Sequence, residues 1–201
     1  MEQNALFKLG YGLYVLTTKD GEKQNGCIIN TVMQVTNTPN RICIAVNKGN
    51  HTHNMLLQSK CFNVSVLSQK ATFDVFKHFG FQSGREVDKF KDYPHKKLAA
   101  NDVYYITEGT NAYITGYVKE TLDLGTHTLF IADVVNAVSL NDDVSATYDY
   151  YHKNIKPAPE TQKKKGWVCK VCGYVYEGEE LPPDYVCPLC KHGAEDFEKL
   201  T

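Results

Sequence analysis

The sequence has almost no net charge, no long hydrophobic run and no feature of an exported protein. Its 201 residues include 22 lysines and arginines against 23 aspartates and glutamates, which leaves a formal net charge of −1. Such a chain has no general attraction to nucleic acid or to an anionic membrane. No apolar stretch approaches the ~18 residues of a spanning helix, and the opening MEQNALFKLG lacks a signal-peptide pattern. We therefore expect a cytoplasmic protein with neither a nucleic-acid nor a membrane partner.

Two common nucleotide-binding motifs are also missing. The sequence contains neither G-x-G-x-x-G after a first strand nor G-x-x-x-x-G-K-[ST]. The Rossmann site and the P-loop depend on these glycines to bring the backbone close to phosphate groups. A nucleotide cofactor, if there is one, must be bound by a different arrangement.

The seven cysteines are distributed unevenly, and the two sets are expected to have different roles. Cys27, Cys43 and Cys61 lie apart in strand-like stretches, where we expect small, buried, apolar side chains. The other four form two C-x-x-C pairs near the C-terminus. Clustered pairs indicate metal or redox chemistry in a reducing compartment, where disulfides are rare.

The apolar pattern of the first three quarters predicts a mainly β fold. Strand patterns and turn signals occupy residues 11–48, and two long strand patterns, NAYITGYVKET and THTLFIADVVNAVSL, follow later. A helix is predicted to start near Thr52. Many strands with short turns and few helices are typical of an antiparallel barrel rather than a doubly wound sheet.

The composition changes after residue 155. The stretch IKPAPETQKKKG has two prolines, a lysine run and no apolar periodicity. We therefore predict a domain over residues 1–155, an exposed linker over 156–165 and a second domain over 166–201. We interpret the lysine run as solvated, with a nucleic-acid patch as the alternative. Because roughly 36 residues cannot bury enough apolar surface to fold alone, the second domain needs another source of stability.

A bound metal would supply that stability. Two C-x-x-C turns brought together offer a tetrahedral set of thiolates from Cys169, Cys172, Cys187 and Cys190. Tetrahedral sulfur suits either zinc or iron, and the spacing does not separate them.

The residues around these cysteines resemble rubredoxins. The stretches CKVCGYVYEGE and CPLCKHGAEDFEKL share with that family Gly173, Tyr174, Tyr176, Pro188 and Phe197. Only 14 residues separate Cys172 from Cys187, as in the short rubredoxin-type domain of rubrerythrins. The resemblance implies one iron that carries single electrons. It also implies that the aromatic side chains form a small core over the metal.

Hydrogen-bond donors gather where the strand ending at Val46 meets the predicted helix. They are Asn47, Lys48, Asn50, Thr52 and His53. Free backbone N–H groups and the helix dipole favour a phosphate at such a place. An ordinary turn with a helix cap is the alternative interpretation.

The segment before this loop and two later ones complete a second resemblance. The stretch INTVMQVTNTPNRICIAVNKGNHTH, with FGFQSGREVDKF and LGTHTLFIADV, resembles the flavin reductase-like family of FMN-binding split barrels. Thr126 stands where that family commonly has aspartate. The resemblance implies an FMN-binding split β-barrel with the isoalloxazine along Asn30, Thr31, Val32, Met33 and Gln34. It also implies a homodimer with FMN near the interface.

Several residues receive roles from this resemblance. The phosphate and ribityl chain are expected at residues 47–53. Ser83, Gly84, Arg85 and Lys89 are expected to close over the site or contact the phosphate, with a solvated loop as the alternative. His127 is the candidate for orienting the nicotinamide or the flavin, against a satisfied strand histidine. The reductant would be NADH or NADPH.

As a whole, the chain resembles the high-molecular-weight rubredoxin family, in which both domains occur together. This implies an electron-transfer oxidoreductase that moves electrons from NAD(P)H through FMN and iron to a flavodiiron protein, for oxygen or nitric oxide reduction. Two alternatives stay open. One is a flavin or ferric reductase with a structural zinc-ribbon tail, and the other is a non-catalytic barrel with a zinc ribbon that acts as a binding module.

Overall fold

The computed structural model describes residues 3–157 and 166–200. The chain divides into two compact units, Met1–Lys156 and Pro157–Thr201, called here the large unit and the small unit. Most of the predicted linker, including its lysine run, lies outside the described residues, so the linker stays a prediction. No described helix has the length and apolar character needed to cross a membrane.

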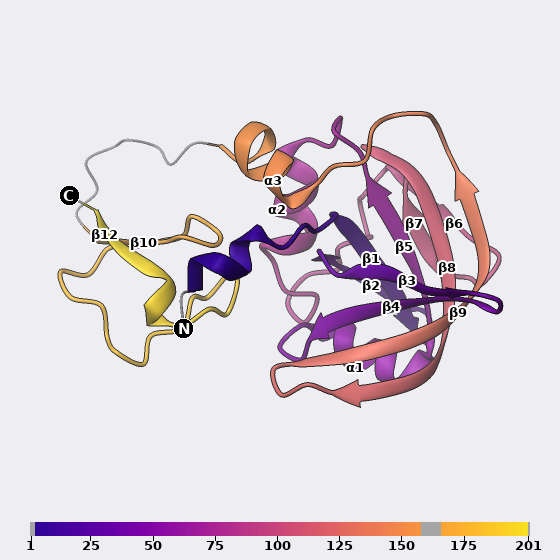
Figure 1. Ribbon diagram of the computed structural model, residues 1–201, viewed down its shortest axis with the longest axis horizontal. Helices are drawn as coiled ribbons and strands as arrows, with labels where there is room; N and C mark the ends of the chain where they lie inside the picture. The colour runs from indigo at the N-terminus through magenta and orange to yellow at the C-terminus, as the bar shows by residue number, and fades with distance from the viewer. Residues whose placement is uncertain (1–2, 158–165, 201) are drawn as a thin grey trace. The chain divides into compact units, whose positions relative to one another are not determined.

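The large unit is built on one antiparallel sheet of seven strands (Figure 1). Their order is β2–β1–β5–β8–β9–β4–β3, which leaves β2 and β3 at the two edges. The strands are β1 Tyr14–Asp20, β2 Lys23–Ile29, β3 Val32–Asn37, β4 Asn40–Asn47, β5 Cys61–Leu67, β8 Thr110–Asp123 and β9 His127–Ser139. A separate pair is formed by β6 Lys96–Leu98 and β7 Tyr104–Ile106. The predicted mainly β fold is confirmed.

Alternating side chains explain why the sheet curls around a core. In β9, Thr128, Phe130 and Ala132 are buried while their neighbours are more exposed, as expected for a strand with one face inward. The inner core joins residues from six elements: Leu16, Cys27, Ile29, Ile42, Ile44, Val46, Leu56, Phe62, Val64, Phe130 and Ala132. Cys27, Cys43 and Cys61 are buried, as predicted.

Helices cover the barrel at two places. Helix α1, His51–Ser59, begins one residue before the predicted start and packs against β1, β2 and β5. Helix α2, Phe73–Gly80, buries Val75, Phe76 and Phe79 in a second core outside the barrel. The remaining helical segments of the large unit are η1 Gln3–Lys8, α3 Tyr148–Tyr150 and η2 Tyr151–Ile155.

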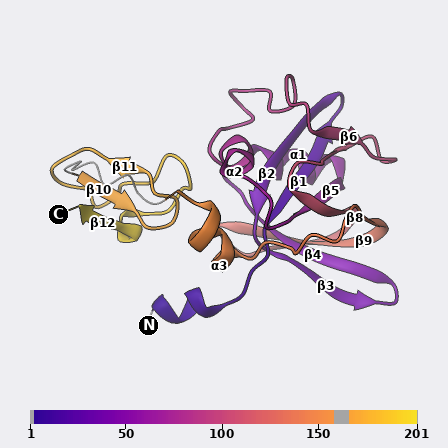
Figure 2. The same cartoon turned by 90° about the horizontal axis from the view of Figure 1, so that it is seen from above.

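The small unit has a three-stranded sheet in the order β11–β10–β12 (Figure 2). The strands are β10 Gly166–Cys169, β11 Val175–Tyr176 and β12 Phe197–Leu200, with the short helix η3 Ala194–Asp196 before the last. Trp167, Tyr174, Tyr176, Tyr185 and Phe197 pack with the cysteines in one cluster. The predicted role of the aromatic residues as a core over the metal-ligating residues is confirmed.

Candidate functional site

The four predicted metal ligands converge in the small unit. The Cys169 and Cys190 Sγ atoms lie 3.5 Å apart, the Cys172 and Cys187 Sγ atoms lie 3.4 Å apart, and all four lie within 4.8 Å of one another. A tetrahedral ion with metal–sulfur bonds of about 2.3 Å needs sulfur–sulfur distances near ~3.8 Å. The donor set therefore fits a four-thiolate metal centre.

The two C-x-x-C turns share one hydrogen-bond pattern. In the first, the Gly173 N–H donates to the Cys169 carbonyl (2.8 Å). In the second, the Lys191 N–H donates to the Cys187 carbonyl (2.9 Å). Gly173 and Lys191 both adopt left-handed backbone conformations, with φ of 80° and 63°. The turns thus present their sulfur atoms in matching ways although a lysine occupies the second left-handed position.

Backbone N–H groups also point at the sulfur atoms. The pKa of Cys169 is lowered by contacts with the Cys172 and Cys190 sulfurs. The N–H groups of residues 171 and 172 lower it further. Contact with Cys169 raises the pKa of Cys172 and of Cys190, and the N–H groups of Tyr174 and His192 act in the opposite direction. Such donors stabilise thiolates and orient them for a metal.

The predicted isoalloxazine segment lies along β3, an edge strand. Thr31 fixes its start, because its hydroxyl donates to the Ala45 carbonyl (3.0 Å) and its carbonyl accepts from the Ala45 N–H (3.3 Å). Among the strands of the described residues, β3 pairs only with β4, which leaves its other edge open. An open strand edge offers backbone N–H and C=O groups, so this segment fits the polar rim of a flavin.

The predicted phosphate loop joins β4 to α1. Asn47 shapes the turn, since its side-chain oxygen accepts from the Gly49 N–H (2.8 Å) and its carbonyl accepts from the Asn50 N–H (3.0 Å). Asn50 is the N-cap residue of α1, yet its side chain makes no capping hydrogen bond. Asn47 also pairs with His127 across β4 and β9, so the structure brings this loop next to His127.

Two side chains of the loop are directed inward rather than toward solvent. His53 is 4% exposed; its Nε2 lies 2.8 Å from the Thr128 hydroxyl and its ring packs edge-on against Phe130. Thr52 is buried and its hydroxyl accepts from the Asn25 side-chain amide (3.0 Å). Both side chains stabilise the loop from within. We therefore expect the backbone at the start of α1, rather than these two side chains, to contact a ligand.

Lys48 and His127 lie beside the turn between β8 and β9. The Lys48 ammonium lies 2.5 Å from the Asp123 carboxylate, and this contact, followed by the Gly125 N–H, lowers the pKa of Asp123. Nδ1 of His127 lies 2.9 Å from the Thr126 hydroxyl. Lys48 is therefore held by an ion pair, and the side chain at position 126 positions the histidine ring.

The segment around Gly84 packs onto the same loop. The Arg85 guanidinium donates to the Gly49 carbonyl (2.9 Å). A methyl group added at Gly84 would lie 2.2 Å from the Asn25 side-chain oxygen, so a larger residue there would displace the Asn25 side chain. Asn47, Arg85 and His127 thus meet around the end of β4 and the start of α1, while residues 31–34 run along β4 from Ala45 to Ile42.

Comparison with known proteins accounts for both units. Residues 6–159 match the flavin reductase like domain family, and residues 167–198 match the rubredoxin-like domain of rubrerythrin. The chain belongs to the flavin reductase like family. Its small unit is a rubredoxin-like domain, as the cysteine geometry and the aromatic core indicate.

Two relatives of this flavin reductase like chain and one solved structure illustrate the similarity. A high molecular weight rubredoxin of Moorella thermoacetica is 35% identical and is aligned over 100% of both chains. The ferric-chelate reductase (NAD(P)H) of Archaeoglobus fulgidus is 38% identical over 76% of this chain and 89% of its own. Among solved structures, an FMN-binding protein of Thermus thermophilus superposes with a TM-score of 0.58 and 26% identity, covering 66% of this chain and 72% of that one.

The ammonium group of Lys89 does not have the role predicted for it in this flavin reductase like unit. It is 4% exposed, and its ammonium donates to the carbonyls of Gly26 (2.8 Å) and Phe79 (2.9 Å). Burial lowers its pKa. The structure therefore corrects the expectation of a phosphate contact or a solvated loop at this position, because the ammonium ties α2 to β2 inside the protein.

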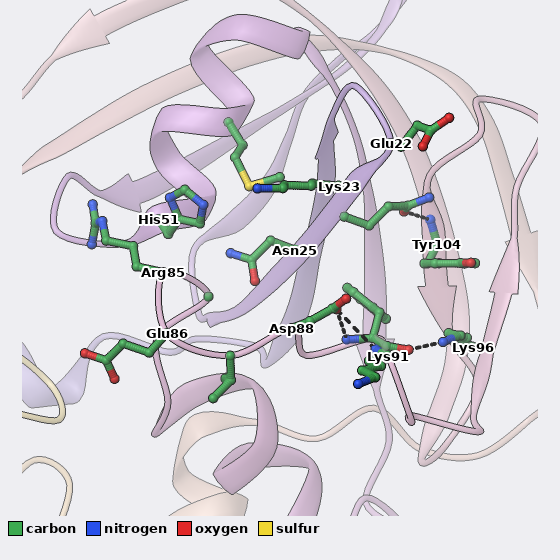
Figure 3. Close-up of a pocket in the computed structure, with 15 residues that line it drawn as sticks. Glu22, Lys23, Asn25, His51, Arg85, Glu86, Asp88, Lys91, Lys96 and Tyr104 are labelled. Atoms are coloured by element: carbon green, nitrogen blue, oxygen red, sulfur yellow. Dashed lines mark hydrogen bonds between the residues drawn. The ribbon is translucent and has the colours of Figure 1, made fainter.

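A cavity of about 520 Å³ lies beside β2 and the start of α1 (Figure 3). Gly84 and Arg85, both predicted from the sequence, line it. No sequence pattern pointed to the other lining residues, because they come from segments far apart in the chain: Glu22, Lys23, Gln24, Asn25, His51, Met55, Glu86, Val87, Asp88, Phe90, Lys91, Lys96 and Tyr104. Ser83 precedes this lining and accepts from the Arg85 N–H with its hydroxyl (3.2 Å).

Proposed function

We propose that the protein is an NAD(P)H-dependent electron-transfer oxidoreductase. The large unit would bind FMN and take electrons from NADH or NADPH, and the small unit would deliver them singly to an acceptor protein. The observation that carries this proposal is the presence, in one chain, of a flavin reductase like domain and a four-cysteine site with the geometry of a metal centre. The full-length similarity to a high molecular weight rubredoxin supports it.

The described residues suggest how FMN would be held. The backbone at the start of α1, uncapped by Asn50, and the guanidinium of Arg85 are suited to the phosphate. The open edge of β3 is suited to the isoalloxazine. The similarity to an FMN-binding protein supports FMN in particular.

Each unit would contribute a different part of the chemistry. Bound FMN would supply hydride acceptance from a nicotinamide, and iron bound by four thiolates would supply one-electron transfer. N–H groups along β3 would stabilise the negative charge of the reduced flavin. His127, placed beside the phosphate loop by its pairing with Asn47, would orient the nicotinamide or the flavin. The N–H groups of Tyr174 and His192 would stabilise the negative charge on the sulfur ligands.

A spectrum of the purified protein during anaerobic addition of NADH tests this route. We expect flavin and ferric-thiolate absorption bands, bleaching of both on NADH addition, and one iron per chain by mass spectrometry. Chelation of iron is the control, because it should remove the second set of bands while the flavin still bleaches. A tail that holds zinc after expression with ample iron would contradict the route through the small unit.

A flavodiiron protein is the acceptor that we propose, for oxygen or nitric oxide reduction. Release of electrons to a ferric chelate is a second candidate activity, favoured by the 38% identity to a ferric-chelate reductase. Rates with each acceptor separate the two. If a flavodiiron protein is the acceptor, removal of iron from the small unit should greatly lower the rate of its reduction. If a ferric chelate is the acceptor, removal of that iron should leave the rate unchanged.

We also propose a homodimer, because several large apolar side chains of the sheet are exposed. Strand pairing aligns Met33 with Cys43 and Ile131 across β3, β4 and β9. Met33 and Val135 are 61% and 58% exposed, and Val35 and Leu122 are exposed as well. Exposed apolar side chains mark interaction sites where they gather on a soluble protein, and a second copy of the chain would cover these. Sedimentation at micromolar concentration should give twice the chain mass of 22.7 kDa for the wild type and a monomer for Met33→Glu.

A further inference from the structure

The second C-x-x-C turn of the small unit carries a lysine where the first carries a glycine. Gly173 and Lys191 occupy equivalent positions, since each N–H donates to the carbonyl of the first cysteine of its turn. Both backbones are left-handed, with φ of 80° and 63°. This conformation is open to glycine but unfavourable for a residue with a Cβ atom. The second turn therefore bears a conformational cost that the first avoids, which indicates a role for the lysine side chain.

The side chain of Lys191 does not contribute to the packing of the small unit. Lys191 is exposed, and within the part of the chain that the structure describes its ammonium has no hydrogen bond or ion pair. The other two lysines described in this unit are engaged. The Lys170 ammonium donates to the Glu195 carbonyl (3.3 Å), and the Lys199 ammonium lies 5.6 Å from the centre of the Trp167 ring. Among the described lysines of the small unit, Lys191 is thus the uncommitted one.

This uncommitted cation is attached to the more exposed side of the candidate metal site. Cys169 and Cys187 are fully buried, whereas Cys172 and Cys190 are half-buried. Lys191 directly follows Cys190, and its N–H donates to the Cys187 carbonyl (2.9 Å). The backbone of Lys191 is therefore fixed to both cysteines of its turn. Its ammonium stays within the length of one side chain from a sulfur atom that solvent reaches.

The charge balance of the small unit makes a cation at this place significant. Acidic residues outnumber the three lysines over residues 166–200: they are Glu177, Glu179, Glu180, Asp184, Glu195, Asp196 and Glu198. The charge of four thiolates outweighs that of a ferric or a ferrous ion, and reduction of the ion makes the site more negative still. Surrounding carboxylates oppose this reduction, while a cation beside the sulfur atoms favours it.

We propose that Lys191 sets the reduction potential of the small unit, because its positive charge beside Cys190 stabilises the reduced, more negative form of the site. This makes the small unit a better acceptor of single electrons from a reduced flavin. The inference rests on the proposed function, in which the four thiolates hold iron. The charge is exposed and screened by water, so we expect it to change the equilibrium constant for reduction by about threefold, or about 28 mV for a one-electron couple.

The test variant is Lys191→Gln in the full, iron-loaded chain. A titration with redox mediators, followed through the ferric-thiolate absorption, measures the midpoint potential without NADH. We expect the potential of Lys191→Gln to fall by the amount given above and that of Lys191→Arg to match the wild type. Lys199→Gln is the matched control, because it removes the same charge from β12, away from the C-x-x-C turns, and should shift the potential by less than half as much. Molar salt should shrink the difference between Lys191→Gln and the wild type, since it screens exposed charges.

A second variant, Lys191→Gly, separates the charge of the side chain from the conformation of the backbone. Glycine adopts the left-handed conformation without the cost that lysine bears. In the zinc-loaded protein, which has no redox chemistry, we expect this variant to lose metal to a chelator no faster than the wild type. In the iron-loaded protein its midpoint potential should fall as it does in Lys191→Gln. Faster loss of zinc from Lys191→Gly would show that the lysine is kept for stability instead.

Equal midpoint potentials in Lys191→Gln and the Lys199→Gln control would overturn the role of Lys191. Failure of NADH to reduce the wild-type protein would overturn the proposed function instead. In that case the mediator titration would still decide whether Lys191 sets the potential, because it supplies electrons directly to the small unit. A small unit that takes up no iron on reconstitution would overturn both.

Discussion

Replacing Cys187 by serine is expected to empty the small unit of metal and to unfold it. Cys187 is fully buried, and its sulfur lies 3.4 Å from that of Cys172. Binding of a structural four-ligand metal contributes about 10–16 kcal/mol to the folding of domains this small. A hydroxyl is a much poorer ligand than a thiolate, so most of that free energy is lost. Metal analysis should fall from one iron per chain to none.

The same variant should separate the two halves of the proposed activity. Anaerobic bleaching of the flavin by NADH should proceed at the wild-type rate, because the large unit has its own core. NADH-linked reduction of the acceptor protein should fall to background. Cys43→Ser is the control, since Cys43 is a buried thiol of the large unit and should leave the iron content unchanged. Retention of one tightly bound iron by the Cys187→Ser protein would contradict the four-thiolate assignment.

Replacing Lys89 by methionine is expected to destabilise the large unit by about 2–4 kcal/mol, because two buried carbonyls lose their hydrogen-bond donor. The carbonyls are those of Gly26 and Phe79, which anchor β2 and α2. Methionine fills a similar volume, so lost packing contributes little. Urea unfolding followed by circular dichroism measures the change.

Lys97→Met is the matched control for this substitution. Lys97 is exposed on β6, and surface changes of this kind stay within about 0.5 kcal/mol. If both variants unfold at the same urea concentration as the wild type, the buried ammonium has no structural role and the phosphate-contact interpretation of Lys89 returns.

The Lys89 variant should also alter the pH dependence of stability. Burial lowers the pKa of Lys89 in the folded protein below the ordinary value of about 10.4. Between the two values the unfolded chain binds the proton and the folded chain does not, so the stability contributed by this group rises with pH. The stability gap between wild type and Lys89→Met should therefore widen as pH increases through that window. A constant gap would show that Lys89 keeps its proton in the fold.

The small unit was predictable because its determinants are local in sequence. Each C-x-x-C pair closes its own turn through hydrogen bonds such as Gly173 to Cys169, and a chain this short has few other ways to fold. The β character of the large unit followed from side-chain alternation, which is a property of each strand by itself. The position of α1 was predicted to within one residue for the same reason.

The proposed flavin site was predictable only in part. Local sequence indicated donors at residues 47–53, but their burial depends on contacts from distant strands. His53 turns inward because Thr128 lies opposite, 75 residues away. Lys89 turns inward and donates to the carbonyl of Gly26, which lies 63 residues away in the sequence.

By itself, the sequence determined the candidate metal ligands, the β fold of the large unit and the segments of the proposed flavin site, since these depend on spacing and alternation within short stretches. Only the tertiary structure decided which donors of those segments face outward. It also decided that Lys23, Asn25, Arg85 and Lys91 share a cavity. The physical reason is that burial and electrostatic potential are set by neighbours in space, and these residues are brought together by the packing of β2, α1 and the segment after α2.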